Sequence, residues 1–123
     1  MTDLAGLRVM IVEDEYLLAR QLSRSLGREG AEVVACVASV PAALAAVAEG
    51  AAIDVAILDV NLGGEKVYPV ATELARRGIR FVFLSGYDLK DRDQGFASVP
   101  HLSKPVTITM LARTLRAAAA PPA

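Results

Sequence analysis

Several residue types are scarce in this 123-residue chain, which has one cysteine, one histidine, no tryptophan and only 5% aromatic residues. Cys36 has no second cysteine to pair with, so an internal disulfide is excluded. Its apolar neighbours in the run 33–37 predict a small, buried side chain without a redox role. We expect His101 to be a partly buried strand residue and not a metal ligand.

The chain also lacks an excess of either charge. Its 13 Lys and Arg residues and 14 Asp and Glu residues give a net charge of −1, and the basic residues are scattered. Without a basic stripe, nucleic acid is not an expected partner. No apolar run approaches the roughly 20 residues that span a bilayer, and the first residues do not form a secretory signal. We therefore expect a cytoplasmic protein that does not bind a membrane.

What the chain does have is the composition of one globular domain, with 54% hydrophobic and 22% charged residues. Short apolar runs, typical of buried strands, alternate with segments whose apolar residues recur at helical spacing. We expect strands at residues 8–12, 32–37, 54–59, 79–84 and 100–103. We expect helices at 16–28, 39–50 and 67–78 and after Thr107, with only a short or frayed helix between 87 and 99.

This alternation predicts an α/β fold with a doubly wound, five-stranded parallel sheet, helices on both faces and strand order 2-1-3-4-5. No linker interrupts the pattern, so residues 1–123 are interpreted as one domain with a core at about 7–117 and a frayed tail at 118–123. The tail is expected to be the natural end of the chain, with a severed linker as the alternative.

Polar side chains follow four of the expected strands. Glu13 and Asp14 follow the first strand, Asp59 ends the third, Ser85 follows the fourth and Lys104 follows the fifth. Each alone has an ordinary interpretation as a helix cap or turn residue. Because the carboxyl ends of parallel strands lie at one edge of the sheet, the sequence predicts that these side chains form one site.

The predicted site favours phosphoryl chemistry. Closely packed carboxylates repel one another unless a cation neutralises them, and oxygen ligands without His or Cys favour Mg²⁺. Lys104 would supply a mobile positive charge opposite the metal, leaving space between metal and ammonium for a phosphoryl group, with the Ser85 hydroxyl as a hydrogen-bond donor. Asp59, at the centre, is then the expected nucleophile, since carboxylates form aspartyl-phosphate intermediates.

Over essentially its whole length the chain resembles the receiver domains of two-component response regulators. The resemblance is carried by the acidic pair, the acceptor, the hydroxyl and the lysine–proline pair, here Glu13, Asp14, Asp59, Ser85, Lys104 and Pro105. It implies that Asp14, Asp59 and the backbone carbonyl of Asn61 bind Mg²⁺, with Glu13 acting through water. The segments 59–64 and 83–87 further resemble the stand-alone FATGUY receivers, which implies a sensor histidine kinase of the HWE or a related class as partner.

The sequence departs from the family at one position. His101 stands three residues before Lys104, where the family usually has an aromatic switch residue. The familiar coupling of the Ser85 hydroxyl to rotation of an aromatic ring is therefore not expected in its usual form. Tyr87 is a candidate for that role, so Ser85, Tyr87 and His101 form the expected set of switch residues.

The resemblance implies a single-domain response regulator, a phosphoprotein of phosphorelay signalling that catalyses only its own phosphorylation and dephosphorylation and is not an enzyme. It would take a phosphoryl group on Asp59 from a phosphohistidine and signal to an unknown downstream protein, either through altered protein–protein binding or by phosphorelay. One alternative is a Mg²⁺-dependent aspartyl-phosphate hydrolase, although such phosphatases have a paired-aspartate motif where this chain has Glu13, Asp14 and Glu15. A second is a binding module that is never phosphorylated. A flavin-binding function is less favoured, because no phosphate-binding loop follows the first strand.

Overall fold

The computed structural model describes residues 4–86 and 95–119, and within them the chain folds as alternating strands and helices. The strands are β1 (Arg8–Val12), β2 (Glu32–Val37), β3 (Val55–Asp59), β4 (Asn61–Leu62), β5 (Glu65–Lys66), β6 (Arg80–Ser85) and β7 (His101–Ser103). The helices are α1 (Tyr16–Arg28), α2 (Val40–Ala48), α3 (Tyr68–Arg76) and α4 (Ile108–Ala119).

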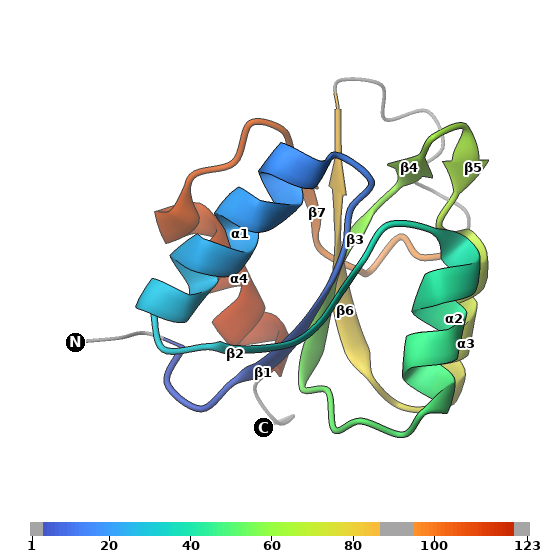
Figure 1. Cartoon of the computed structure of the whole chain (residues 1–123), viewed down its shortest axis with the longest axis horizontal. Helices are drawn as coiled ribbons and strands as arrows, with labels where there is room; N and C mark the ends of the chain where they lie inside the picture. Colours follow the sequence, from blue (N-terminus) through green and yellow to red (C-terminus); the bar gives the residue numbers. More distant parts are fainter. Residues whose placement is uncertain (1–3, 87–94, 120–123) are drawn as a thin grey trace.

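Five of the strands form one parallel sheet in the order β2-β1-β3-β6-β7. Because β6 and β7 are the fourth and fifth strands of this sheet, the predicted order 2-1-3-4-5 is confirmed. Helices α1 and α4 lie on one side of the sheet, and α2 and α3 lie on the other (Figure 1). The chain therefore has the doubly wound α/β fold, in which the carboxyl ends of the strands form a common edge.

The central strands are buried on both faces, which explains why they read as continuous apolar runs. Along β1, Val9 and Ile11 belong to the core under α1 and α4, whereas Met10 and Val12 belong to the core under α2 and α3. All four side chains are fully buried. Side chains that alternate between two helix layers hold β1, and the acidic residues that follow it, in a fixed position.

Local sequence signals set the helix boundaries. The Ser39 hydroxyl accepts a hydrogen bond from the backbone N–H of Ala42 and so caps α2. Thr107 caps α4 in the same way, accepting from Met110 N–H at 3.1 Å. Helix α4 continues to Ala119, two residues beyond the core boundary expected at 117. The alanines at this end explain the extension, since alanine has the highest intrinsic helix propensity.

The segment between β3 and α3 differs from the expected loop at Gly63 and Gly64. It forms a short antiparallel hairpin in which Asn61 pairs with Lys66 and Leu62 pairs with Glu65. The two glycines form its turn with φ of 61° and 93°, and two adjacent positive values suit a tight hairpin. The Gly-Gly pair is a known hairpin signal, but strands of two residues are too short to be recognised by alternation.

The prediction that Cys36 is buried is wrong, because its side chain is exposed. Cys36 lies on β2, the edge strand, whose residues are all exposed or half-buried, and it lines a hollow together with Tyr16 and Arg20 of α1. The helix expected within 87–99 is only partly testable: residues 87–94 lie outside the described residues, and residues 95–100 form turns and bends without a helix. Among the described residues, no helix combines the length and apolarity needed to cross a membrane.

Candidate functional site

The candidate site lies at the carboxyl edge of the parallel sheet. Among the described residues, only three polar or charged side chains are buried: Glu13, Asp59 and Ser85, which are 2%, 4% and 5% exposed. Each follows or ends a different strand, namely β1, β3 and β6. Burying carboxylates and hydroxyls is unfavourable unless they have partners, so their concentration at one edge marks a functional site.

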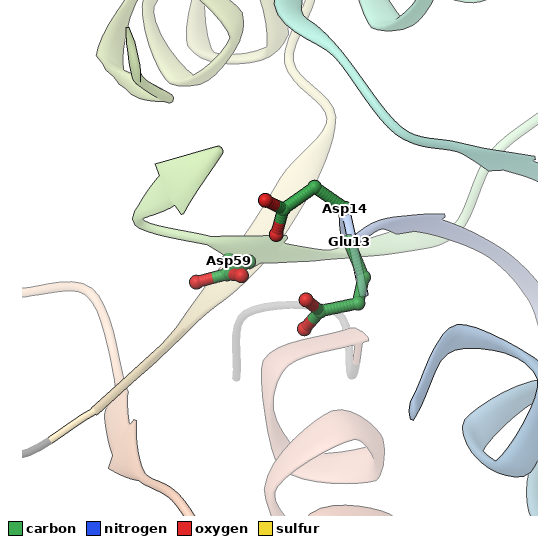
Figure 2. A group of neighbouring side chains, drawn as sticks. All are labelled: Glu13, Asp14 and Asp59. Atoms are coloured by element: carbon green, nitrogen blue, oxygen red, sulfur yellow. The ribbon is translucent and has the colours of Figure 1, made fainter. Parts of the chain in front are cut away.

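Three carboxylates converge at this edge. Asp59 ends β3, and Glu13 and Asp14 come from the loop after β1, with their side chains directed toward a common region (Figure 2). One carboxylate oxygen from each of the three lies within 4.8 Å of the other two. Asp14 is exposed to solvent, whereas the other two are buried. The sequence predicted this grouping from the strand ends.

The environment of Glu13 disfavours its charged form. The pKa of its carboxyl is raised from 4.5 to about 7, because burial and then the hydrogen bond and negative charge of Asp59 raise it by more than the backbone N–H of Glu15 and the ammonium of Lys104 lower it. Its Oε1 lies 3.1 Å from Nζ of Lys104 but receives no aligned hydrogen bond from the described residues. This oxygen therefore remains available to another donor or to a cation.

The donor set of the cluster fits a hard divalent cation. Glu13, Asp14 and Asp59 offer only oxygen atoms, two of the carboxylates are buried, and Oε1 of Glu13 accepts no aligned hydrogen bond from the part of the chain that the structure describes. A cation would relieve the repulsion among these groups. The exposure of Asp14 leaves room for the water ligands that small hard cations keep.

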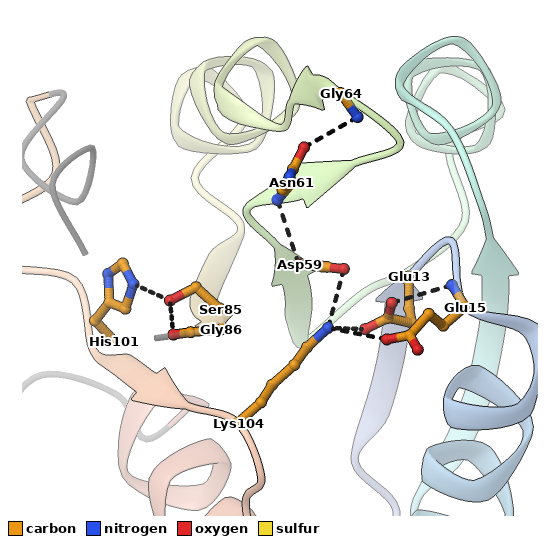
Figure 3. A network of polar contacts seen from close by, with 9 residues as sticks. All are labelled: Glu13, Glu15, Asp59, Asn61, Gly64, Ser85, Gly86, His101 and Lys104. Carbon is orange, nitrogen blue, oxygen red and sulfur yellow. Dashed lines mark hydrogen bonds and ion pairs between the residues drawn. The ribbon is translucent and has the colours of Figure 1, made fainter. Parts of the chain in front are cut away.

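Lys104 follows β7, the edge strand on the other side of the sheet, and reaches back over the strand ends (Figure 3). Its Nζ lies 3.2 Å from Oδ2 of Asp59 and 3.7 Å from Oε1 of Glu15. Its backbone N–H donates to the carbonyl of Ser85 at 2.7 Å, and the peptide bond to Pro105 is cis. Burial disfavours the ammonium, but the hydrogen bonds and charges of Glu13 and Asp59 outweigh this effect and raise the pKa of Lys104.

The contact with Glu15 was not foreseen from the sequence. Glu15 precedes α1, and its side chain is 68% exposed, so the ion pair with Lys104 is peripheral. The position of Glu15 directly after Glu13 and Asp14 is the feature of the sequence that could have indicated this contact.

Asn61 lies in β4, which begins two residues after Asp59, the last residue of β3. Its backbone N–H is 3.3 Å from Oδ1 of Asp59, and its side-chain Oδ1 accepts from Gly64 N–H at 3.1 Å. A side chain at Gly63 would lie 3.6 Å from Oδ2 of Asp14, so the hairpin turn comes close to the acidic cluster. The β4–β5 hairpin, which the sequence does not predict, thus forms one wall of the site.

Ser85 and His101 form the other side of the site. The Ser85 Oγ lies 2.9 Å from Nε2 of His101, which belongs to the neighbouring strand β7 (Figure 3). His101 is half-buried, in agreement with the prediction. Tyr87, the remaining expected switch residue, lies outside the described residues. The sequence named Ser85 and His101 but gave no indication of their direct contact, which depends on the pairing of β6 with β7.

A groove runs from this edge along the face formed by α1 and α4. It has a volume of about 700 Å³ and is lined mainly by apolar side chains, among them Leu18, Leu22, Ile108 and Leu111, with Lys104 in its wall. The groove therefore connects an apolar surface directly with the charged site.

Comparisons with known proteins agree with this geometry. The chain matches the family model of the response regulator receiver domain over residues 9–116. The solution structure of SdrG from Sphingomonas melonis Fr1 is similar, with 44% identity, a TM-score of 0.80 and coverage of 98% of this chain and 100% of that chain. The BeF3-activated conformation of SdrG, from Pseudomonas melonis Fr1, has 44% identity, a TM-score of 0.78 and coverage of 94% and 98%.

A crystal structure of a response regulator receiver protein from Sinorhizobium medicae WSM419 is 25% identical, with a TM-score of 0.79 and coverage of 93% of this chain and 94% of that chain. The comparison with curated proteins finds no match. The family match covers most of the chain, and the relative with 44% identity is covered along its full length. On these grounds the chain belongs to the response regulator receiver domains of two-component signalling.

Proposed function

We propose that this chain is a single-domain response regulator that accepts a phosphoryl group on Asp59 from the phosphohistidine of a sensor histidine kinase. The observation that carries the proposal is the position of Asp59, a buried carboxylate at the end of β3 with Nζ of Lys104 at 3.2 Å and two further acids beside it. A nucleophile held this close to a cation is favourable for attack on an anionic phosphoryl group.

In the proposed reaction, a carboxylate oxygen of Asp59 forms a bond to phosphorus while the bond from phosphorus to the imidazole nitrogen breaks. The departing nitrogen keeps the electron pair of that bond, and the phosphoryl group keeps its oxygens. Lys104 would hold one phosphoryl oxygen through its ammonium group, and Ser85 would donate its hydroxyl hydrogen to another. The role of this chain is to orient the acceptor and to neutralise charge, which is sufficient for phosphoryl transfer between good donors and acceptors.

We infer that Mg²⁺ is the cation of the acidic cluster, held by Asp14, Asp59 and the backbone carbonyl of Asn61, with Glu13 acting through water. When bound, Mg²⁺ would neutralise charge on the phosphoryl oxygens. The oxygen-only donor set and the buried Oε1 of Glu13, which has an ion pair with Lys104 but no aligned hydrogen bond from the described residues, support this assignment.

The signal would reach other proteins by changing the surface around β6, β7 and α4. Ser85 and Lys104 belong to this region and contact each other through the backbone, with Lys104 N–H donating to Ser85 C=O at 2.7 Å. Movement of either residue toward a phosphoryl group would therefore alter the edge of the sheet. A kinase of the HWE or a related class remains the proposed donor, and the groove between α1 and α4, which is continuous with the site, is a suitable docking surface for it.

The proposal is tested by the mass of the intact protein after incubation with acetyl phosphate, with and without Mg²⁺. We expect a single phosphoryl adduct on the wild type only when Mg²⁺ is present, and none on Asp59→Ala. Asp54→Ala is the matched control, because Asp54 precedes the same strand at its opposite end and pairs with Arg8 away from the site. Equal labelling of Asp59→Ala and wild type would refute the assignment.

A further inference from the structure

The ring of His101 is held in a fixed position on β7. It lies against Phe83 of β6, with ring centroids 5.6 Å apart, and the two residues are aligned in the parallel pairing. Phe83 is fully buried and itself contacts Tyr68, Phe81 and Phe96 in an aromatic cluster. A ring supported by such a cluster loses little further freedom when it forms a hydrogen bond.

The Ser85 hydroxyl has two contacts on this side of the site. Nε2 of His101 lies at 2.9 Å and the carbonyl oxygen of Gly86 at 3.4 Å. Both contacts are satisfied when Nε2–H donates to Oγ and the hydroxyl hydrogen points to Gly86, and the shorter contact is also satisfied when the hydroxyl donates to Nε2. In either arrangement Oγ is directed toward the imidazole, while Asp59 lies on the opposite side with Lys104 (Figure 3).

We propose that His101 is a positioning residue that holds the Ser85 hydroxyl away from Asp59 in the unphosphorylated protein. This inference rests on the proposed function, in which Ser85 donates to a phosphoryl oxygen on Asp59. To make that bond, Oγ must leave its position 2.9 Å from Nε2, so the hydrogen bond to His101 opposes the phosphorylated conformation. A phenyl ring at this position would keep the packing on Phe83 but could not form the hydrogen bond.

The size of the effect follows from the net strength of one hydrogen bond. Removing it should shift the equilibrium toward the phosphorylated conformation by a factor of about 2 to 12. Such a shift is small compared with full activation. His101 would therefore change the degree of phosphorylation at which the protein responds, but the protein would still respond without it.

The test uses beryllium fluoride in excess Mg²⁺ as a stable phosphoryl analogue, followed by the backbone amide signals in NMR spectra. Wild type, His101→Phe and His101→Gln are compared by the beryllium fluoride concentration at half-saturation. We expect His101→Phe to require about 2- to 12-fold less than wild type. His101→Gln, whose amide nitrogen can still reach Oγ, should resemble wild type. An unchanged or higher half-saturation for His101→Phe would overturn the inference, as would an equal decrease for both variants.

A double-mutant cycle separates the hydrogen bond from changes in packing. In a Ser85→Ala background there is no hydroxyl to hold, so His101→Phe should cause no further change, and the same decrease in that background would contradict the inference. Wild type that fails to bind beryllium fluoride in Mg²⁺ would instead refute the proposed function. If wild type binds beryllium fluoride with the same half-saturation as His101→Phe, only the role of His101 would be refuted.

Discussion

Nζ of Lys104 lies 3.2 Å from Oδ2 of Asp59, although the two residues are 45 positions apart in the chain. The same ammonium lies 3.1 Å from Oε1 of Glu13, so one cation spans two buried carboxylates, one directly after β1 and one at the end of β3. Because Lys104 follows β7 directly, its side chain links the edge of the sheet to the centre. A phosphoryl group on Asp59 would enter between these charges, and the response of Lys104 would be transmitted to β7.

Lys104→Ala should therefore separate phosphorylation from its consequences. We expect labelling by acetyl phosphate to remain measurable, because Asp59 and the acidic cluster are retained. The changes in the amide signals of Ser85 and Gly86 on labelling should be lost, since no ammonium would connect the phosphoryl group with β7. Arg113→Ala, which removes an exposed cation of α4, is the control and should respond like wild type. A full spectral response in Lys104→Ala would contradict this role.

Asp14→Ala should weaken Mg²⁺ binding by about tenfold or more, given that changes to groups outside the ligand shell alone cost about 10- to 100-fold. Asp14 is the exposed member of the acidic cluster, so its loss should disturb folding little. Calorimetric titration with Mg²⁺ measures the effect directly. Asp54→Ala controls for the loss of one negative charge elsewhere, and similar affinities for Asp14→Ala and wild type would exclude Asp14 as a ligand.

Much of the fold could be predicted because its central strands are buried on both faces. The runs 9–12 and 55–58 have no polar residue, and a helix-period segment follows each, so the alternation of the α/β fold is visible. Once the order of the strands is known, the polar residue after each strand must lie at one edge. This explains why the grouping of Glu13, Asp14, Asp59 and Lys104 was foreseen.

The remaining features depend on relationships that local pattern does not contain. Cys36 has the neighbours of a buried residue, but its exposure follows from the place of β2 at the edge of the sheet. The contact between Ser85 and His101 requires the register of β6 and β7, which are joined by a long and weakly patterned segment. The pairing register of two strands joined in this way is fixed by tertiary packing. The distance between Ser85 and His101 could therefore not be predicted from the sequence.

Leu74→Ala tests the core on the α2 and α3 side of the sheet. Leu74 is fully buried in α3, so this substitution should lower the free energy of unfolding by about 2 to 5 kcal/mol. Leu17→Ala is a matched control, since Leu17 is also helical but 78% exposed, and it should change stability by less than about 0.5 kcal/mol. Urea denaturation monitored by circular dichroism gives both values, and equal losses would contradict the packing described.

The pKa of Glu13 makes the stability of the Mg²⁺-free protein dependent on pH. Burial and the proximity of Asp59 raise this pKa from 4.5 to about 7 in the folded state. When a carboxyl has a higher pKa in the folded state than in the unfolded state, its contribution to the free energy of unfolding is fully present at pH values below the unfolded-state pKa. That contribution is lost as the pH rises through the folded-state pKa. Stability should therefore decrease between about pH 4.5 and pH 7, by up to about 3 kcal/mol for this group alone.

Glu13→Gln should abolish that decrease and be more stable than wild type above pH 7 without Mg²⁺, because a neutral amide avoids the repulsion from Asp59. Glu73→Gln is the control of opposite sign: hydrogen bonds from Arg76 and Arg77 lower the pKa of Glu73 to about 2, so its contribution is present at neutral pH and lost only in acid. Urea unfolding at pH 5 and pH 8 distinguishes the two variants. The opposite result would be a wild-type stability that rises from pH 5 to pH 8 while the stability of Glu13→Gln stays constant. It would show that the folded protein stabilises the charged form of Glu13, which contradicts the effect expected from burial beside Asp59.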